Sequence, residues 1–250
     1  MNTVAIIQAR MSSSRLPGKV LLPLIDKPVL EHVVSRLKHA KALNEIIVAT
    51  STGADDDAIE RWAKSNEVHC FRGSLNDVLD RYYQAACLYK ADAIVRITAD
   101  CPVIDPIVVD EVVAGFKEGG FDAYGLSGEF PDGLDCQVFS FSALEKAWKE
   151  ADLPSEREHV GPYIEKTHPE LFNLGGLEKF SNLSHLRWTL DEDRDYELLK
   201  QIYTELYVAD HLFLTNDILN LLERRPELLE INSQITRNEG YLKSLEMESK

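Results

Sequence analysis

Cysteine, long apolar runs and positive charge are all scarce in this chain. The cysteines, Cys70, Cys87, Cys101 and Cys136, form no CxxC pair and have no neighbouring histidine pattern that would indicate zinc, so we expect reduced, mostly buried thiols. No apolar run approaches the roughly 20 residues of a membrane span, and the N-terminus lacks the hydrophobic region of a signal peptide. Lys and Arg total 27 against 42 Asp and Glu, which gives a formal net charge of -15.

These scarcities narrow the class of protein. A broad basic face does not survive such an acidic balance, which argues against general affinity for nucleic acid or for anionic membranes. We therefore expect a cytoplasmic enzyme or binding protein. A chain of 250 residues suits one large α/β domain, which we place at residues 1–225. The polar tail at 226–250 has room for a short helix near 241–247.

Positive charge is nonetheless concentrated in one stretch near the N-terminus. The sequence QARMSSSRLPGK at 8–19 has Arg10, Arg15 and Lys19 as its only charged side chains, and the first acidic residue of the chain is Asp26. Three serines add hydroxyl donors, and the Pro-Gly pair shapes the backbone so that N–H groups turn toward an anion. The spacing matches neither GxxxxGK[ST] nor GxGxxG. The stretch therefore predicts an anion-binding loop of another kind.

Apolar runs typical of buried strands alternate with helical patterns in the first half of the chain. Strands are expected at Val4–Ala9, Glu45–Ser51, Val68–Phe71 and Asp92–Thr98. A helix should begin at Ser74 with Asp77 in a capping box. Such alternation implies right-handed crossovers and a three-layer α/β/α, Rossmann-like fold with a mostly parallel sheet. The second half is less regular: the sequence predicts helices at 142–150, 157–167, 196–207 and 216–224, and a strand at 186–190.

Two aspartates directly follow predicted strands. Ligands bind at the carboxyl ends of parallel strands, so Asp100 and the basic loop should share one edge of the sheet. Asp191 likewise follows an apolar strand. Asp100 also fits a turn or helix cap, and Asp191 with its acidic neighbours also fits a solvated helix start. Because Mg²⁺ prefers oxygen ligands, the two carboxylates and the basic loop together describe a site for phosphoryl or nucleotidyl transfer.

Several stretches resemble the CMP-sugar synthetase group of cytidylyltransferases, in particular its spore-coat polysaccharide protein F branch. They are IIQARMSSSRLPGKVL, FRGSLNDVLDRY, RITADCPVIDP, REHVGPYIEKTHPE and LRWTLDEDRDYELL. The resemblance implies a nucleotide-diphospho-sugar transferase fold of the GT-A-like type. It also implies a homodimer and an Mg²⁺-dependent transfer of CMP from CTP to a sugar or sugar acid, with release of pyrophosphate, for surface polysaccharide or glycan synthesis.

Matching the family motifs residue by residue implies a set of roles. Arg15, Lys19 and Asp100 would be catalytic, and Asp100 and Asp191 would hold the metal. The acceptor would meet Asp135, Arg157 and His159, with Arg96 as a weaker candidate, although Asp135 also fits a turn and His159 a helix surface. Gln137 stands where the branch usually has glutamate, which puts an acidic role there in doubt. The nucleotide would contact Gln8, Ala9, Arg10, Ser13, Arg15, Lys19, Arg72, Gly73, Asp80 and Arg81.

Other functions stay open at this level. A transferase of the same fold could use another nucleoside triphosphate or a non-sugar acceptor, and a non-catalytic nucleotide-binding module would share the loop. The presence of the complete set of Arg10, Arg15, Lys19, Asp100 and Asp191 favours an enzyme. A glycosyltransferase of this fold would show a DxD metal motif after the fourth strand, and the sequence Asp-Cys-Pro at 100–102 does not supply one.

Overall fold

The chain folds around one large sheet. The computed structural model describes residues 1–209, 211–237 and 239–248. The sheet has seven strands in the order β5-β4-β1-β6-β8-β7-β9. Strands β1, β4, β5 and β6 are parallel, β8 is antiparallel to both of its neighbours, and β9 is parallel to β7. Their bounds are β1 Thr3–Gln8, β4 Glu45–Ser51, β5 His69–Gly73, β6 Ala93–Thr98, β7 Ala123–Ser127, β8 Gln137–Ser140 and β9 Leu174–Glu178.

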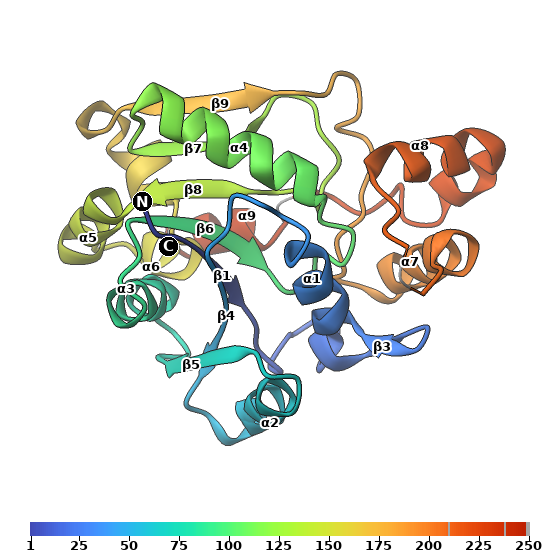
Figure 1. Cartoon of the computed structure of the whole chain (residues 1–250), viewed down its shortest axis with the longest axis horizontal. Coiled ribbons are helices and arrows are strands. Elements are labelled where there is room, and N and C mark those ends of the chain that lie inside the picture. The colour runs from blue at the N-terminus through green and yellow to red at the C-terminus, as the bar shows by residue number, and fades with distance from the viewer. Residues whose placement is uncertain (210, 238, 249–250) are drawn as a thin grey trace.

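Helices cover both faces of this sheet, which confirms the three-layer prediction. The helices are α1 Val29–Leu37, α2 Asp57–Ser65, α3 Val78–Leu88, α4 Pro106–Gly119, α5 Phe141–Glu150, α6 Pro154–His159, α7 Asp193–Leu206, α8 Thr215–Arg224 and α9 Glu239–Glu248. In Figure 1, α4 crosses in front of β7 and β8, and α7 and α8 lie together at one end. Their bounds are those of the helices that the described residues form.

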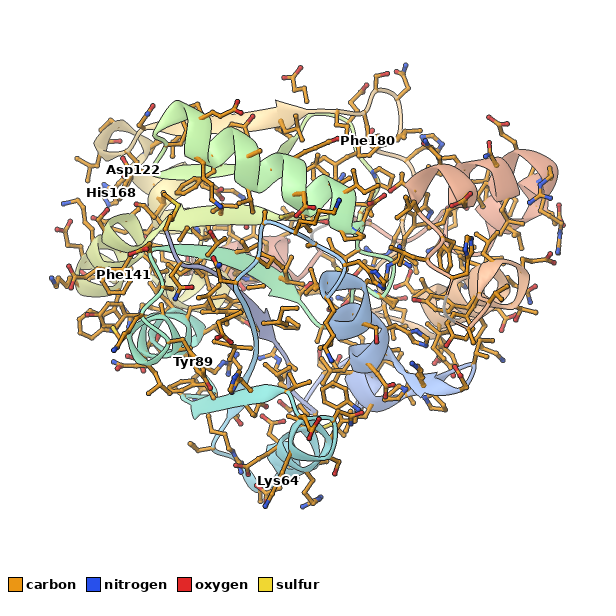
Figure 2. All side chains as sticks on the ribbon, viewed as in Figure 1. Lys64, Tyr89, Asp122, Phe141, His168 and Phe180 are labelled. Atoms are coloured by element: carbon orange, nitrogen blue, oxygen red, sulfur yellow. The ribbon has the colours of Figure 1, made fainter. Side chains whose placement is uncertain are left out.

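The core has one apolar cluster on each face of the sheet. The larger cluster includes buried side chains of α1, α4 and α7, and the smaller one includes those of α3 and α5. Strand β1 contributes to both because alternate side chains of a strand point to opposite faces: Ala5 and Ile7 lie in the first cluster, and Val4 and Ile6 lie in the second. Figure 2 shows side chains filling the spaces between the helices and the sheet.

The helix after β5 begins later than predicted. Its N-cap is Asp77, whose side chain accepts from the N–H of Asp80, and α3 starts at Val78 rather than at Ser74. Ser74 instead accepts from the N–H of Asp77 through its hydroxyl. Both residues have side chains that cap backbone N–H groups, and the sequence alone did not distinguish a turn followed by a cap from one longer helix.

The strand predicted at 186–190 is wrong, although the segment is buried. Residues 186–190 bond to loops, with a single bridge between Asp132 and Arg187 and no ladder. The N–H of Trp188 donates to Asp132 O, and that of Leu190 donates to Asp100 O. Gly133 permits this close approach, because it has a φ of 102° and a Cβ there would lie 2.6 Å from the backbone of Trp188.

Other elements also differ from the predictions. The helix predicted at 157–167 is divided into α6 and a π-helical turn at Tyr163–Thr167, since Val160 has a φ of 70° and ends α6. The sequence analysis did not foresee β9 or the small hairpin of β2 Pro23–Leu24 and β3 Lys27–Pro28. None of the helices formed by the described residues has the length and apolar character needed to cross a bilayer.

Candidate active site

Two loops leave the sheet side by side at the carboxyl ends of β1 and β6. Gln8 and Thr98 pair at the ends of these strands, and the N–H of Ala99 donates to Gln8 O at 3.0 Å. The first loop carries the basic stretch and the second carries Asp100. A cavity of about 290 Å³ lies here, and its wall includes the predicted residues Gln8, Ala9, Arg10, Ser13, Arg15, Lys19, Arg81, Asp100 and Asp191. The shared edge predicted from the sequence is therefore present.

Lys19 joins the two predicted metal ligands. It opens a 3₁₀ turn directly after Gly18, whose φ of 73° is a left-handed conformation that glycine adopts at little cost. Its Nζ donates to Asp100 Oδ2 at 2.5 Å, to Asp191 Oδ1 at 2.8 Å and to Leu190 O at 2.7 Å. Burial alone would lower the pKa of Lys19, but the two carboxylates outweigh it and the pKa is raised. The ammonium therefore stays charged.

Arg15 is surrounded by carboxylates. Its guanidinium nitrogens lie 3.0 Å from Asp191 Oδ1, 2.8 Å from Glu239 Oε2 and 3.5 Å from Glu192 Oε1. Asp191 and Glu192 follow the 186–190 segment, whereas Glu239 begins α9 near the end of the chain. Both Arg15 and Lys19 are thus neutralised by acidic side chains from distant parts of the sequence.

Arg187 holds Asp191 in place. Its Nη2 donates to Asp191 Oδ2 at 2.8 Å, its Nε to Asp195 Oδ1 at 2.9 Å and its Nη1 to Asp132 Oδ2 at 2.6 Å. Burial would raise the pKa of Asp191, but Lys19, Arg15 and Arg187 together lower it to about 2. Asp191 is therefore ionised at neutral pH and fixed in orientation, as a metal or phosphate site requires.

The acceptor candidates Asp135 and His159 line a second cavity of about 360 Å³, together with Arg96, Lys166 and Arg237. A smaller hollow of about 230 Å³ shares lining residues with both cavities, including Asp100 and Asp191 on one side and Asp135 and His159 on the other. The two cavities therefore adjoin.

Gln137, which departs from the family pattern, has a defined partner in the second cavity. Its side-chain nitrogen donates to both oxygens of Glu165 at 2.8 Å, and its oxygen accepts from Arg96 Nη1 at 3.1 Å. Burial raises the pKa of Glu165. An amide suits this position because it can donate to a carboxylate and accept from a guanidinium at the same time.

The structure does not bring three of the predicted residues to these cavities. Arg72 pairs with Asp57 and Glu60. Asp80 accepts from the indole of Trp148, and Arg157 pairs with Asp77. Gly73 lies against Arg81, since a Cβ on Gly73 would be 3.1 Å from Arg81 Cγ. Their nucleotide- and acceptor-binding roles stay predictions.

The sequence analysis missed residues that position the site. Asp56 is buried and accepts from the N–H of Met11 at 2.7 Å, which ties the basic loop to the end of β4. Arg187 and Asp132 orient Asp191, and Glu239 reaches Arg15 from the tail. A charged residue inside the apolar run LRWTL was a usable signal for Arg187, because a buried arginine needs partners. No local signal pointed to Glu239.

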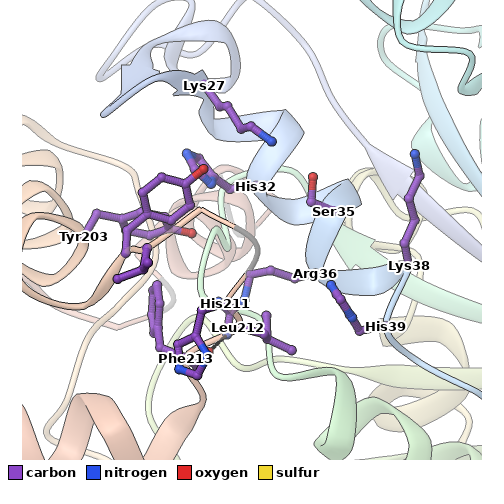
Figure 3. A pocket seen from close by; sticks show the side chains of 12 residues that line it. Lys27, His32, Ser35, Arg36, Lys38, His39, Tyr203, His211, Leu212 and Phe213 are labelled. Carbon is purple, nitrogen blue, oxygen red and sulfur yellow. Dashed lines mark hydrogen bonds between the residues drawn. The ribbon is translucent and has the colours of Figure 1, made fainter.

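Another cavity, of about 350 Å³, lies between α1 and the segment that joins α7 to α8 (Figure 3). Arg36, His32 and Phe213 are among its lining residues, and it shares none with the cavities at the strand ends. Arg36 donates to the carbonyls of Ile104 and Phe213 and lies 4.7 Å from the Phe213 ring centroid. These contacts explain the buried arginine by packing.

The carboxylates at the strand ends fit a cation that substrate oxygens help to hold. Within the described residues, no group of three or more His, Cys, Asp and Glu side chains is arranged to hold a metal ion. Asp100 Oδ2 and Asp191 Oδ1 nevertheless converge on a single cationic atom, the Nζ of Lys19. Mg²⁺ in nucleotide sites is commonly bound by one or two carboxylates together with phosphate oxygens.

This fold and this site define a nucleotidyltransferase. The sequence matches the cytidylyltransferase family over residues 4–218, and the chain belongs to that family. It is 33% identical to the spore coat polysaccharide biosynthesis protein SpsF of Bacillus subtilis, over 89% of this chain and 94% of that protein. It is 30% identical to an 8-amino-3,8-dideoxy-manno-octulosonate cytidylyltransferase of Shewanella amazonensis, over 75% of this chain and 85% of that enzyme.

A solved structure agrees with this assignment. A cytidylyltransferase from Leptospira borgpetersenii superimposes with a TM-score of 0.87 at 36% identity, over 94% of this chain and 98% of that one. The resemblance to the CMP-sugar synthetase group, and the fold that it implied, are therefore confirmed.

Proposed function

We propose that this cytidylyltransferase transfers CMP from CTP to a hydroxyl group of a sugar acid and releases pyrophosphate, with Mg²⁺ as cofactor. The observation that carries the proposal is the convergence of Lys19, Asp100 and Asp191 beside Arg15 at the strand ends. Cations that hold phosphates and carboxylates that hold a metal are the two requirements of phosphoryl-group chemistry.

The basic loop supplies donors for a triphosphate. Arg15 and Lys19 are charged, partly or largely buried, and already aligned by hydrogen bonds to acidic oxygens. Arg81 lines the same cavity, and its buried Nε has no hydrogen-bond partner among the described residues. Phosphate oxygens would take over these donors, and preorganised charge of this kind stabilises the negative charge that develops during transfer.

Asp100 and Asp191 would hold Mg²⁺ together with phosphate oxygens. The ion would neutralise phosphate charge and polarise the α-phosphate. Arg187 keeps the Asp191 carboxylate oriented, and Lys19 keeps both carboxylates close to the phosphate-binding loop. The acceptor oxygen would form the new bond to the α-phosphorus as the bond to pyrophosphate breaks, and the hydroxyl proton would leave with the acceptor side.

The second cavity favours an acidic acceptor. Arg96, Lys166 and Arg237 line it together with two carboxylates, Asp135 and Glu165. Glu165 is held by Gln137, and the Asp135 carboxylate accepts from the N–H of Gly133. The relative from Shewanella amazonensis bears the name of an enzyme that acts on an octulosonate, which is a sugar acid. A carboxylate on the acceptor would find its charge balanced in such a cavity.

Pyrophosphate release measured for each of the four nucleoside triphosphates with a panel of sugars and sugar acids tests the proposal. We expect release with CTP and a sugar acid, and its loss on addition of EDTA with recovery on excess Mg²⁺. Neutral sugars of matched size are the control for the carboxylate. Release with a different nucleotide, or with neutral sugars only, would replace that part of the proposal, and no release with any pair would overturn it.

A further inference from the structure

Helix α9 lies over the candidate active site. It is the last described element, yet it returns to the middle of the molecule (Figure 1). Glu239, Gly240, Lys243, Ser244 and Met247 form one wall of the nucleotide cavity. Tyr241 also lines the acceptor cavity. Both substrates of the proposed reaction would therefore meet α9.

The first residue of α9 occupies a phosphate-binding donor. Glu239 Oε2 accepts from Arg15 Nη1 at 2.8 Å, so a carboxylate takes the place expected for a phosphate oxygen. The side chains of Arg15 and Glu239 are about 27% and 33% exposed, so a soluble anion can reach this pair. A triphosphate bound to Arg15 and the carboxylate of Glu239 would compete for the same donor.

Polar contacts hold the rest of α9 against α6. Glu248 accepts from the N–H of Ser155 at 2.5 Å and from its hydroxyl at 3.0 Å. Ser244 hydrogen bonds to His159 at 3.0 Å, and the ring of Tyr241 meets that of His159 edge-on at 5.2 Å. His159, an acceptor candidate, is therefore covered by α9.

Little apolar surface of α9 is buried. Ser244 is the buried residue of the helix, whereas Leu242, Leu245 and Met247 are 47%, 37% and 68% exposed. A helix attached mainly by surface ion pairs and hydrogen bonds undocks at low free-energy cost, because such contacts exchange readily for water. The attachment of α9 is thus weak in the same place where an anionic substrate should bind.

We propose that α9 is a displaceable cover of the active site, in which Glu239 competes with the substrate phosphates for Arg15 so that nucleotide binding releases the helix. The inference rests on the proposed function, since it takes Arg15 and Lys19 as phosphate ligands. It makes the docked form a resting state that excludes substrates. Binding and undocking are then linked, so weakening the attachment of α9 must strengthen nucleotide binding.

The first test measures binding of CTP and of inorganic tripolyphosphate to the full chain by calorimetry, without an acceptor. Glu239→Gln should bind both ligands about two- to fivefold more tightly, which is the range expected from an ion pair of this exposure. Glu248→Gln loosens the far end of α9, away from Arg15, and should act in the same direction. Glu246→Gln removes an equal charge from an exposed position of the same helix and is the matched control.

Two results would overturn the inference. Weaker binding in Glu239→Gln would mean that Glu239 belongs to the bound site, and tighter binding in Glu239→Gln but not in Glu248→Gln would mean local charge competition without undocking. Hydrogen exchange of α9 gives an independent readout: exchange at 239–248 should become faster when CTP binds, and slower exchange would show closure of the helix over the nucleotide instead. Because tripolyphosphate carries no base, its binding tests the cover even if CTP proves to be the wrong nucleotide.

Discussion

Arg187 and Asp195 form a two-point ion pair in the interior of the protein, with Nε to Oδ1 at 2.9 Å and Nη2 to Oδ2 at 3.0 Å. Asp195 is 0% exposed, and its Oδ2 also accepts from the N–H of Asp191 at 2.9 Å. The same guanidinium binds the Asp191 side chain. This pair therefore fixes both the backbone and the carboxylate of a proposed metal ligand.

Replacing Asp195 should consequently affect both stability and activity. Asp195→Asn leaves the buried Arg187 with less negative charge around it, and we expect the free energy of unfolding to fall by about 3 kcal/mol, as when one partner of a buried ion pair is removed. The KM for CTP should rise, since Asp191 loses its support. Urea denaturation and steady-state kinetics provide the two readouts. Asp193→Asn, exposed at the start of the same helix, is the control, and equal behaviour of the two variants would contradict the positioning role.

Asp100→Asn tests the metal site. Asparagine retains the shape of the side chain and can still accept from Lys19, but it removes a charged Mg²⁺ ligand. We expect kcat for pyrophosphate release to fall by about 10²- to 10³-fold, a loss typical of one group that stabilises transition-state charge. The Mg²⁺ concentration for half-maximal activity should rise. Activity close to that of the unmodified enzyme would remove Asp100 from the metal site, and Asp55→Asn at an exposed position controls for the loss of one negative charge.

Asp132 should make the stability depend on pH. Burial and the charge of Asp135 raise the pKa of Asp132 to about 7, despite its contact with Arg187. Between its ordinary pKa of 3.8 and about 7 the folded state holds the proton more tightly than the unfolded state. This contribution is complete below the ordinary pKa and is lost as the pH rises to about 7, with a slope of at most about 1.4 kcal/mol per pH unit.

The measurement is the free energy of unfolding of the native protein minus that of Asp132→Asn, followed from pH 4 to pH 8. This difference should decline with rising pH and become level above about 7. A difference that stays constant, or that grows with pH, would show that Arg187 keeps Asp132 ionised throughout this range.

Gln137→Glu tests why this chain departs from the family pattern. The variant replaces the amide donor to Glu165 by a second carboxylate, which leaves Glu165 without that partner. We expect a loss of about 1–3 kcal/mol of stability at pH 8. The loss should shrink toward pH 5, where one of the two carboxyl groups takes up a proton. Thermal unfolding at both pH values measures this, with the exposed Gln234→Glu as control; equal losses at the two pH values would argue against carboxylate repulsion.

Local pattern was sufficient for the parts of the protein that depend on near neighbours in sequence. Strand β1, the basic loop that follows it and Asp100 after β6 could all be predicted, because a buried parallel strand is an apolar run and the connectivity of such a sheet sends its ligand-binding loops to one edge. The charges of Arg15 and Lys19 in a strongly acidic chain identified an anion site before any coordinates were considered.

Tertiary structure decided the features that depend on distant segments. The 186–190 segment has the apolar alternation of a strand, but its bonding partners are the loops at Asp132 and Asp100 rather than another strand. Arg187 became a positioning residue only when Asp132, Asp191 and Asp195 met around it. The contact of Glu239 with Arg15 joins residues far apart in the chain, and no periodicity or motif specifies it. Side-chain type and local pattern determined what each segment can form, whereas burial and long-range pairing determined which groups meet in the site.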